Sequence, residues 1–120
     1  MKKVLVVDDS EAIRNQVSRA LQGAGFDVSL AIDGLDALDR AQAADLSMIL
    51  LDVNMPGLSG LDLLDRLSAN GTTKRVPVLM LTTEAQAAMV ARAQNAGAKG
   101  WMIKPVSMES LVSAVLRLAT

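Results

Sequence analysis

Three aspartates follow two apolar runs of this chain, and their spacing suggests shared chemistry. Asp8 and Asp9 come directly after the run from Val4 to Val7, and Asp52 directly follows the run 48–51. If these runs are neighbouring parallel strands, the carboxylates meet at one edge, where pairs about 4 Å apart repel by roughly 4 kcal/mol at an effective dielectric of about 20. Because a folded domain is stable by only about 5–15 kcal/mol in total, the cluster predicts a divalent cation that neutralises it.

Oxygen ligands from a few carboxylates favour Mg²⁺, which keeps several waters and commonly engages a phosphate. Two further apolar runs end in Thr82-Thr83 and in Lys104. Hydroxyls and an ammonium at the same edge would suit a phosphoryl group with charge on its oxygens, and Asp52 is then the natural nucleophile. The chain has no histidine, so the most common general base and an internal phosphohistidine are both excluded.

Five apolar runs alternate with helical patterns, and these elements must position the side chains. The first, third and fourth runs are apolar throughout, as in strands buried on both faces, whereas the second and fifth alternate with polar residues, as in edge strands. Right-handed crossovers then favour an α/β doubly wound five-stranded parallel sheet of order 2-1-3-4-5, with ligands at the carboxyl ends of the first and third strands. The predicted strands are 3–8, 27–31, 47–52, 76–82 and 99–103, and the predicted helix stops are Gly23-Ala24-Gly25, Asn70-Gly71 and Asn95-Ala96-Gly97.

Composition narrows the class of protein. With 120 residues, 51% hydrophobic content and a formal net charge of −1, the sequence predicts one globular domain over 1–120. It contains no cysteine, no apolar run of membrane-spanning length and no signal-peptide pattern, so we expect a cytoplasmic protein without membrane insertion. Lysine and arginine are dispersed along the chain and the aromatics are one Trp and one Phe, which argues against direct binding of nucleic acid.

These residues and their order resemble the receiver domain of bacterial two-component response regulators, and in particular the stand-alone, CheY-like chemotaxis type. The resemblance covers essentially the whole chain, and the start at Met1 and the end one helix after Lys104 favour a free-standing domain. It implies the flavodoxin-like (βα)5 fold. The motifs that carry it are "VLVVDDS", "ILLDVNMPGLSGLDLL", "VPVLMLTTEA" and "GAKGWMIKPVSMESL".

The resemblance also implies a role for each site residue. Asp52 would be the phosphoacceptor, and Thr82 the switch hydroxyl that bonds the phosphoryl group. Mg²⁺ would be held by Asp9, Asp52 and the backbone carbonyl of Asn54, with Asp8 acting through a metal-bound water. The remaining implied assignments are Lys104 as charge partner, Trp101 as aromatic rotamer switch, Asn54, Glu84 and Thr83 as residues that modulate rates, and a cis peptide at Lys104-Pro105.

The expected function follows from these roles. The chain would take a phosphoryl group on Asp52 from a histidine kinase, or from a small acyl phosphate, and would catalyse its own phosphotransfer and dephosphorylation rather than act as an enzyme on a separate substrate. Phosphorylation would change a surface formed by the fourth helix, the fifth strand and the fifth helix, where a downstream protein target binds. The last helix carries Val112 and Leu116 beside its buried stripe, so we expect a monomer or a weak dimer.

Other interpretations remain open. The main alternative is a receiver that acts as a phosphate sink or relay intermediate without a docking output, and a more distant one is a Mg²⁺-dependent phosphatase with an aspartyl nucleophile. A flavodoxin-like electron carrier is disfavoured, because acids stand where an anion-receiving loop is needed. Taken alone, Asp8 or Asp9 could cap the first helix, Thr82 or Thr83 could cap the fourth, and Trp101 could simply pack on an edge strand.

Two residues depart from the family pattern. Trp101 replaces the usual Tyr or Phe and is larger, which puts an inward rotamer in doubt. Thr83 stands where chemotaxis relatives often have Ala, and it could narrow access to the site.

Overall fold

A five-stranded parallel sheet forms the centre of the molecule. The computed structural model describes residues 1–43 and 45–120, and the strand order is β2-β1-β3-β4-β5, as predicted. All neighbouring strands pair in parallel. The strands are β1 (Lys3–Val7), β2 (Asp27–Ala31), β3 (Leu46–Leu51), β4 (Val78–Thr82) and β5 (Gly100–Ile103).

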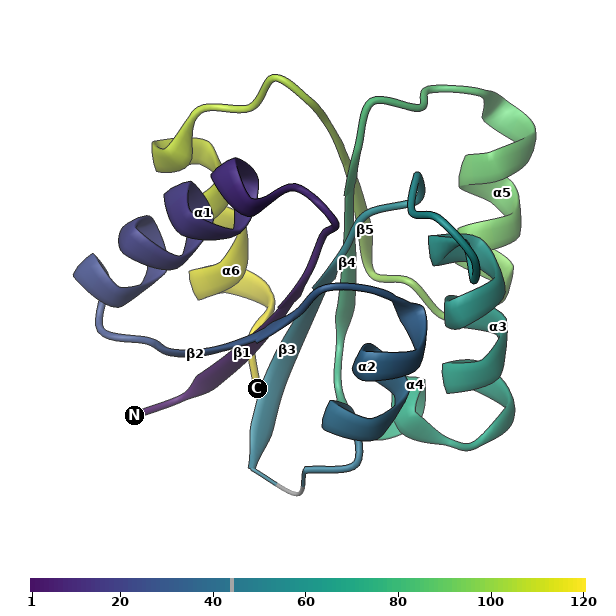
Figure 1. Cartoon of the computed structure of the whole chain (residues 1–120), viewed down its shortest axis with the longest axis horizontal. Helices are drawn as coiled ribbons and strands as arrows, with labels where there is room; N and C mark the ends of the chain where they lie inside the picture. The colour runs from purple at the N-terminus through teal and green to yellow at the C-terminus, as the bar shows by residue number, and fades with distance from the viewer. Residues whose placement is uncertain (44) are drawn as a thin grey trace.

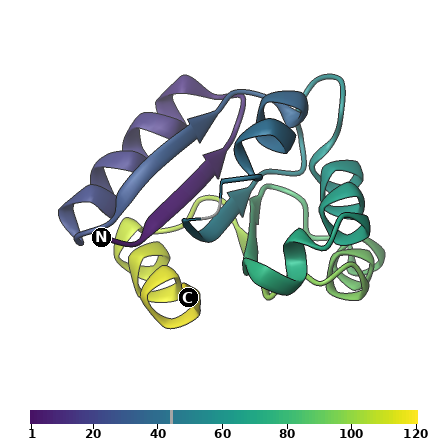
Figure 2. The same cartoon turned by 90° about the horizontal axis from the view of Figure 1, so that it is seen from below.

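Helices cover both faces of this sheet (Figure 1). Two of them, α1 (Glu11–Gly23) and α6 (Met108–Leu118), lie together on one face, and Figure 2 shows them on the opposite side from α3 and α5. The other face carries α2 (Gly34–Arg40), α3 (Gly60–Ala69), the short α4 (Thr72–Arg75) and α5 (Ala87–Asn95).

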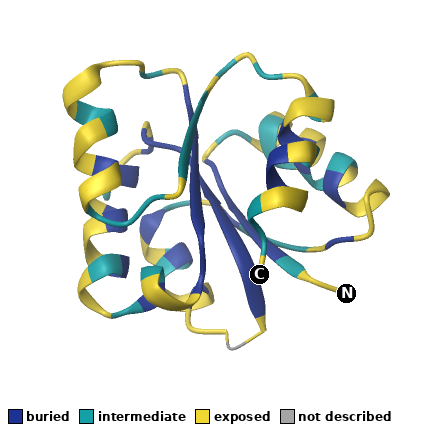
Figure 3. Cartoon of the chain, turned by 180° about the vertical axis from the view of Figure 1, so that it is seen from behind, coloured by how far each residue is buried: buried dark blue, intermediate teal, exposed yellow. Residues whose placement is uncertain are grey.

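The sheet separates two apolar cores. One core joins alternate residues of the strands to α2, α3 and α5, and the other joins the intervening residues to α1 and α6. Every residue of β3 and β4 is buried, whereas β2 and β5 are only half-buried (Figure 3). The prediction that the second and fifth strands form the edges is therefore confirmed.

The element ends differ slightly from the prediction. β4 begins at Val78 instead of Val76, because Pro77 has no N–H for the ladder, although its carbonyl still accepts from the Ile49 N–H at 3.0 Å. The turn α4 was not predicted. Its first residue, Thr72, is buried and donates from both its N–H (3.0 Å) and its hydroxyl (2.6 Å) to the Asn70 side chain.

The helix ends follow local chemistry. Ser10 caps α1 by accepting from the Ile13 N–H, so the alternative in which Asp8 or Asp9 caps this helix is wrong. Gln86 precedes α5 without a side-chain cap bond, so neither Thr82 nor Thr83 caps it. Gly25, Gly71 and Gly97 have φ of 93°, 85° and 104°, which bears out the predicted helix stops.

In the described part of the chain, none of the helices has the length and apolar character needed to cross a membrane.

Candidate functional site

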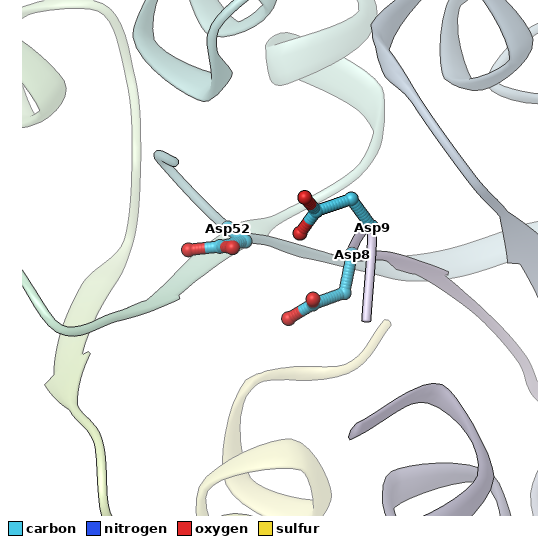
Figure 4. A group of neighbouring side chains, drawn as sticks. All are labelled: Asp8, Asp9 and Asp52. Atoms are coloured by element: carbon cyan, nitrogen blue, oxygen red, sulfur yellow. The ribbon is translucent and has the colours of Figure 1, made fainter. Parts of the chain in front are cut away.

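The three predicted aspartates meet at the carboxyl ends of β1 and β3. One carboxylate oxygen from each of Asp8, Asp9 and Asp52 lies within 4.8 Å of the others, and Figure 4 shows the three side chains together at the ends of the two strands. Asp8 and Asp52 are buried, with 3% and 6% of their surface exposed, whereas Asp9 is open to solvent. The site thus combines two desolvated carboxylates with one accessible carboxylate.

Backbone hydrogen bonds fix the two buried carboxylates at the ends of their strands. The Asp52 N–H donates to the Val7 carbonyl at 3.1 Å, which continues the β1–β3 pairing beyond the last strand residue. On the other chain segment, the Ser10 N–H donates to Asp8 Oδ1 at 2.9 Å, and Arg14 Nη1 donates to the Asp8 carbonyl at 2.7 Å. These bonds hold Asp8 and Asp52 at the ends of their strands.

Lys104 brings the one cationic group that pairs with this cluster among the described residues. Its Nζ lies 2.8 Å from Asp8 Oδ2 and 3.7 Å from Asp52 Oδ2, and its side chain is largely buried. The Lys104 N–H donates to the Thr82 carbonyl at 2.8 Å, which places the residue beside the end of β4, and the Lys104-Pro105 peptide is cis, as the family resemblance implied. The ammonium of Lys104 therefore pairs with both buried carboxylates, Asp8 and Asp52.

The electrostatics of Asp52 follow from this arrangement. Burial raises the pKa of the Asp52 carboxyl, and the nearby charge of Asp8 raises this pKa further. The Lys104 ammonium, the Asn54 N–H and the Thr82 hydroxyl act in the opposite direction without cancelling the effect of burial. Ionised Asp52 is thus held in the folded state at an energetic cost, which a bound cation would lower.

The donor set suits a hard divalent cation. It consists of carboxylate oxygens from Asp8, Asp9 and Asp52, without the sulfur and nitrogen ligands of zinc sites. The Asn54 N–H donates to Asp52 Oδ1 at 3.3 Å, so the backbone that carries the predicted Asn54 carbonyl ligand turns closely around Asp52.

A chain of hydrogen bonds joins the rim of the site to Trp101. Asn54 Nδ2 donates to Thr83 Oγ1 at 3.3 Å and to Glu84 Oε1 at 3.2 Å. The Glu84 N–H donates to Thr82 Oγ1 at 3.2 Å, and Trp101 Nε1 donates to the Glu84 carbonyl at 2.9 Å. Glu84 thus touches both the predicted switch hydroxyl and the predicted aromatic switch through its own backbone.

Sequence reasoning missed Gly60, which lets α3 approach the site closely. A Cβ atom at this position would overlap the Asp52 carbonyl oxygen and lie 2.7 Å from the Val53 Cα. The Gly60 N–H also donates to the Val53 carbonyl at 2.9 Å. A glycine directly after the cap Ser59 was the available signal, since glycine has low helix propensity and needs a packing reason.

Comparison with known proteins agrees with this geometry. The family model of the response regulator receiver domain matches residues 4–116. The chain is 38% identical over 110 residues to the chemotaxis protein CheY-3 of Vibrio cholerae, covering 91% of this chain and 85% of the relative. It is 33% identical over 117 residues to the chemotaxis protein CheY of Pseudomonas aeruginosa, covering 97% and 94% of the two chains.

The solved structures give the same result for the fold. The chemotaxis protein CheY4 of Vibrio cholerae superposes with a TM-score of 0.91 at 42% sequence identity, and the match covers 98% of each chain. The predicted residues Asp8, Asp9, Asp52, Thr82 and Lys104 all lie at the edge of this shared fold where β1, β3, β4 and β5 end. From the sheet order, the aspartate cluster and the family match together, we conclude that the chain belongs to the receiver domains of response regulators, and within them to the CheY-like type.

Proposed function

We propose that this receiver domain accepts a phosphoryl group on Asp52 from the phosphohistidine of a histidine kinase, in a Mg²⁺-dependent reaction, and then binds a downstream protein. The observation that carries the proposal is the placement of Asp52. It is a buried carboxylate in the same cluster as Asp8 and Asp9, with Lys104 Nζ 3.7 Å from its Oδ2. Such a residue can act as a nucleophile toward phosphorus while neighbouring groups manage the charge.

The transfer step forms a bond between Asp52 and phosphorus. A carboxylate oxygen of Asp52 attacks phosphorus in line, the P–N bond of the phosphohistidine breaks, and its electron pair stays on the imidazole of the donor. The product is an aspartyl phosphate. The Lys104 ammonium, now beside Asp8 at 2.8 Å, is close enough to turn toward a phosphoryl oxygen.

Mg²⁺, when bound, would offset the negative charge of the carboxylates and of the oxygens of the transferred phosphoryl group. Asp9 and Asp52 with the Asn54 carbonyl would hold it directly, and Asp8 through a water. Because Asp9 is exposed, a cation held by this carboxylate would remain in contact with solvent and could exchange its water ligands. Asp8 is engaged by Lys104 and by the Ser10 N–H, which supports an indirect role for this residue.

Loss of the phosphoryl group would be self-catalysed by attack of water on phosphorus, which regenerates the Asp52 carboxylate. The side chains of Asn54, Thr83 and Glu84 form a hydrogen-bonded rim, and the Asn54 N–H joins this rim to Asp52. We propose that this rim sets the rate of water entry. Its hydrogen bonds must open before a water can be oriented by Asn54 or Glu84.

The output would be transmitted through Glu84. The Thr82 hydroxyl would turn toward Asp52 to donate to a phosphoryl oxygen, and this movement would break the bond that it now accepts from the Glu84 N–H. A Glu84 backbone released in this way would lose its bond to the Trp101 indole. The surface that responds is formed by α5, β5 and α6, where Ile103 and Leu116 are exposed to 42% and 59%. Exposed apolar side chains of this size support the docking of a protein target.

The phosphodonor would be a protein. An apolar cavity of about 260 Å³ lies beside the site, lined by Ile13, Val17, Val106 and Met108 together with Lys104 and Thr83. It could seat an apolar side chain of a kinase module that presents its phosphohistidine to Asp52.

Fluorescence of the single tryptophan tests the proposal. We would titrate Mg²⁺, then add acetyl phosphate or beryllofluoride, and follow Trp101 emission in the wild type and in Asp52→Asn, with intact mass measured in parallel. We expect a metal-dependent change followed by a phosphodonor-dependent change, and the second change should vanish in the variant. The indole bond to Glu84 makes Trp101 a direct reporter of the rim.

Other results would favour the alternatives. Modification of Asp52 without a change in Trp101 emission or in target affinity would indicate a phosphate sink or relay intermediate. Continuous release of phosphate from a phosphomonoester, over many turnovers and without any effect on a downstream target, would indicate an aspartyl-nucleophile phosphatase. Metal binding with no phosphodonor effect of any kind would contradict the proposal.

A further inference from the structure

A basic cleft lies at the amino-terminal edge of the sheet, at the opposite end of the strands from Asp52. It measures about 660 Å³ and is lined by Lys74, Arg75, Lys99 and Arg117 without any acidic residue. In Figure 1 this edge is the lower one, where α4 and the chain ends lie. These residues come from α4, the start of β5 and the end of α6, so the sequence pattern of dispersed cations did not reveal the cluster.

The four cations are available for a partner. All four are exposed, and none forms an ion pair within 4.0 Å in the part of the chain that the structure describes, where Lys3, Arg40, Arg92 and Lys104 make the ion pairs. Cations beside helix C-termini often serve only to offset the helix dipole. That explanation suits Arg117 in the last turn of α6, but α4 is a single turn and Lys99 belongs to no helix.

Hydrogen bonds and close packing hold the backbone around the cleft in place. Thr72 anchors α4 through two hydrogen bonds to Asn70, and Gly97 packs so closely on α4 that a Cβ there would lie 3.1 Å from Thr73 Oγ1. The Lys99 N–H donates to the Val78 carbonyl at 2.8 Å, which fixes the start of β5. A backbone that is already held in place loses less entropy when the cleft binds a partner.

The lining combines charge with apolar surface. Ala96 and Leu118 are half-buried and lie among the cations, above the buried Val76 and Pro77. A long nucleic acid would need a wider basic surface and aromatic side chains for stacking, whereas the whole chain has a formal net charge of −1. A short segment with carboxylates and apolar side chains matches both parts of the lining.

We propose that the basic cleft is a docking site for an acidic, partly apolar segment of a partner protein. Because the cleft and Asp52 lie at opposite edges of the sheet, docking there would not require phosphorylation. The protein could in this way stay tethered to a partner while the site at Asp52 changes state. The proposal does not depend on the chemistry proposed for Asp52.

Fluorescence anisotropy with a defined probe tests this. The probe is a short labelled peptide of glutamate with interspersed leucine, and the reference peptide has glutamine in place of glutamate. We expect the acidic peptide alone to bind, with affinity that falls as salt rises, and amide signals of Lys99 and Arg117 to shift in NMR spectra. Lys99→Glu with Arg117→Glu should weaken binding by about tenfold or more.

Matched variants test whether peptide binding depends on the cleft residues or only on the overall charge of the protein. Arg19→Glu removes an exposed cation from α1 and should leave affinity nearly unchanged, and Asp52→Asn should do the same. Because an acid at the end of α6 could loosen that helix, Lys99→Gln with Arg117→Gln serves as a milder variant, with thermal unfolding as a check. The proposal would be overturned if Arg19→Glu weakened binding as much as the cleft variants do, or if binding depended on Asp52. It would also be overturned if the cleft preferred pyrophosphate or a single-stranded oligonucleotide to the peptide.

Discussion

At the scale of single residues, the ionised form of Asp52 that the proposed function needs is also the form that lowers the stability of the fold. Its carboxyl is buried, and it faces Asp8 and Asp9 with only Lys104 as a compensating charge among the described residues. Burial and the charge of Asp8 raise its pKa, which means that the folded protein resists ionising the group that the phosphoacceptor role requires.

We therefore predict that Asp52→Asn raises the melting temperature in metal-free buffer. The substitution keeps the shape of the side chain and removes a repelled charge, so the gain should be on the order of 1 kcal/mol, or a few degrees. Thermal unfolding with a chelator present measures it. Asp39→Asn, which removes an exposed acid on α2, is the control and should change the melting temperature much less. A lower melting temperature in Asp52→Asn would contradict the described cluster.

The same residue predicts a pH dependence with a definite sign. Because the pKa of Asp52 is raised above 3.8 in the folded state, the fold binds this proton more tightly than the unfolded chain does. The stabilisation that comes from protonating Asp52 is fully present below the ordinary pKa of 3.8. It is lost as the pH rises through the pKa of Asp52 in the folded state. The stability advantage of Asp52→Asn over the wild type should thus grow between about pH 4 and neutrality in urea unfolding. A constant difference across that range would refute this.

At the scale of elements, the start of α3 decides whether the site can form. Ser59 caps α3 by accepting from the Asp62 N–H, and Gly60 then places the helix against the backbone of Asp52 and Val53. The loop that carries Asn54 is thereby held between the end of β3 and the helix.

Gly60→Ala should therefore damage both fold and site. The added methyl overlaps backbone atoms that cannot move without shifting Asp52, so we expect a loss of about 2 kcal/mol or more in the free energy of unfolding. Phosphoacceptance measured by intact mass with acetyl phosphate should fall as well. Gly23→Ala is the matched control, since a Cβ there meets nothing within 4 Å and α1 ends at this residue. Equal stability of the two variants would show that α3 adjusts freely.

At the scale of the whole molecule, the fold collects charges that the sequence keeps apart. The carboxyl ends of the strands bring three acids together, and the amino-terminal edge collects four cations. Ligand binding at either edge should therefore stabilise the entire domain, because both edges form only when the sheet forms.

For the acidic edge we predict that Mg²⁺ at about 100 times its dissociation constant raises the free energy of unfolding by roughly 2.7 kcal/mol. Asp9→Asn should remove most of this increase, since Asp9 is the exposed carboxylate that a cation reaches first, while Asp39→Asn should retain it. Chemical denaturation with and without Mg²⁺ measures both effects. If Asp9→Asn keeps the full increase, the cation binds elsewhere.

Much of the fold was determined by the sequence alone. The unbroken apolar runs at 4–7, 48–51 and 78–81 favoured strands buried on both faces, and the alternating runs favoured edge strands. With right-handed connections, these assignments favoured the sheet order that the structure has. The acids at strand ends predicted the cluster for the same reason, because parallel strands bring their carboxyl ends to one edge.

Only the tertiary structure decided features that depend on contacts between distant segments. The extra turn α4, the approach of Gly60 to Asp52 and the bond from Trp101 to Glu84 each depend on how one element packs against another. The basic cleft is the clearest case, since Lys74, Arg75, Lys99 and Arg117 are scattered along the chain and meet only through packing. Periodicity and local chemistry specify which face of an element is buried, but the partner that covers this face is set by the three-dimensional arrangement of the whole chain.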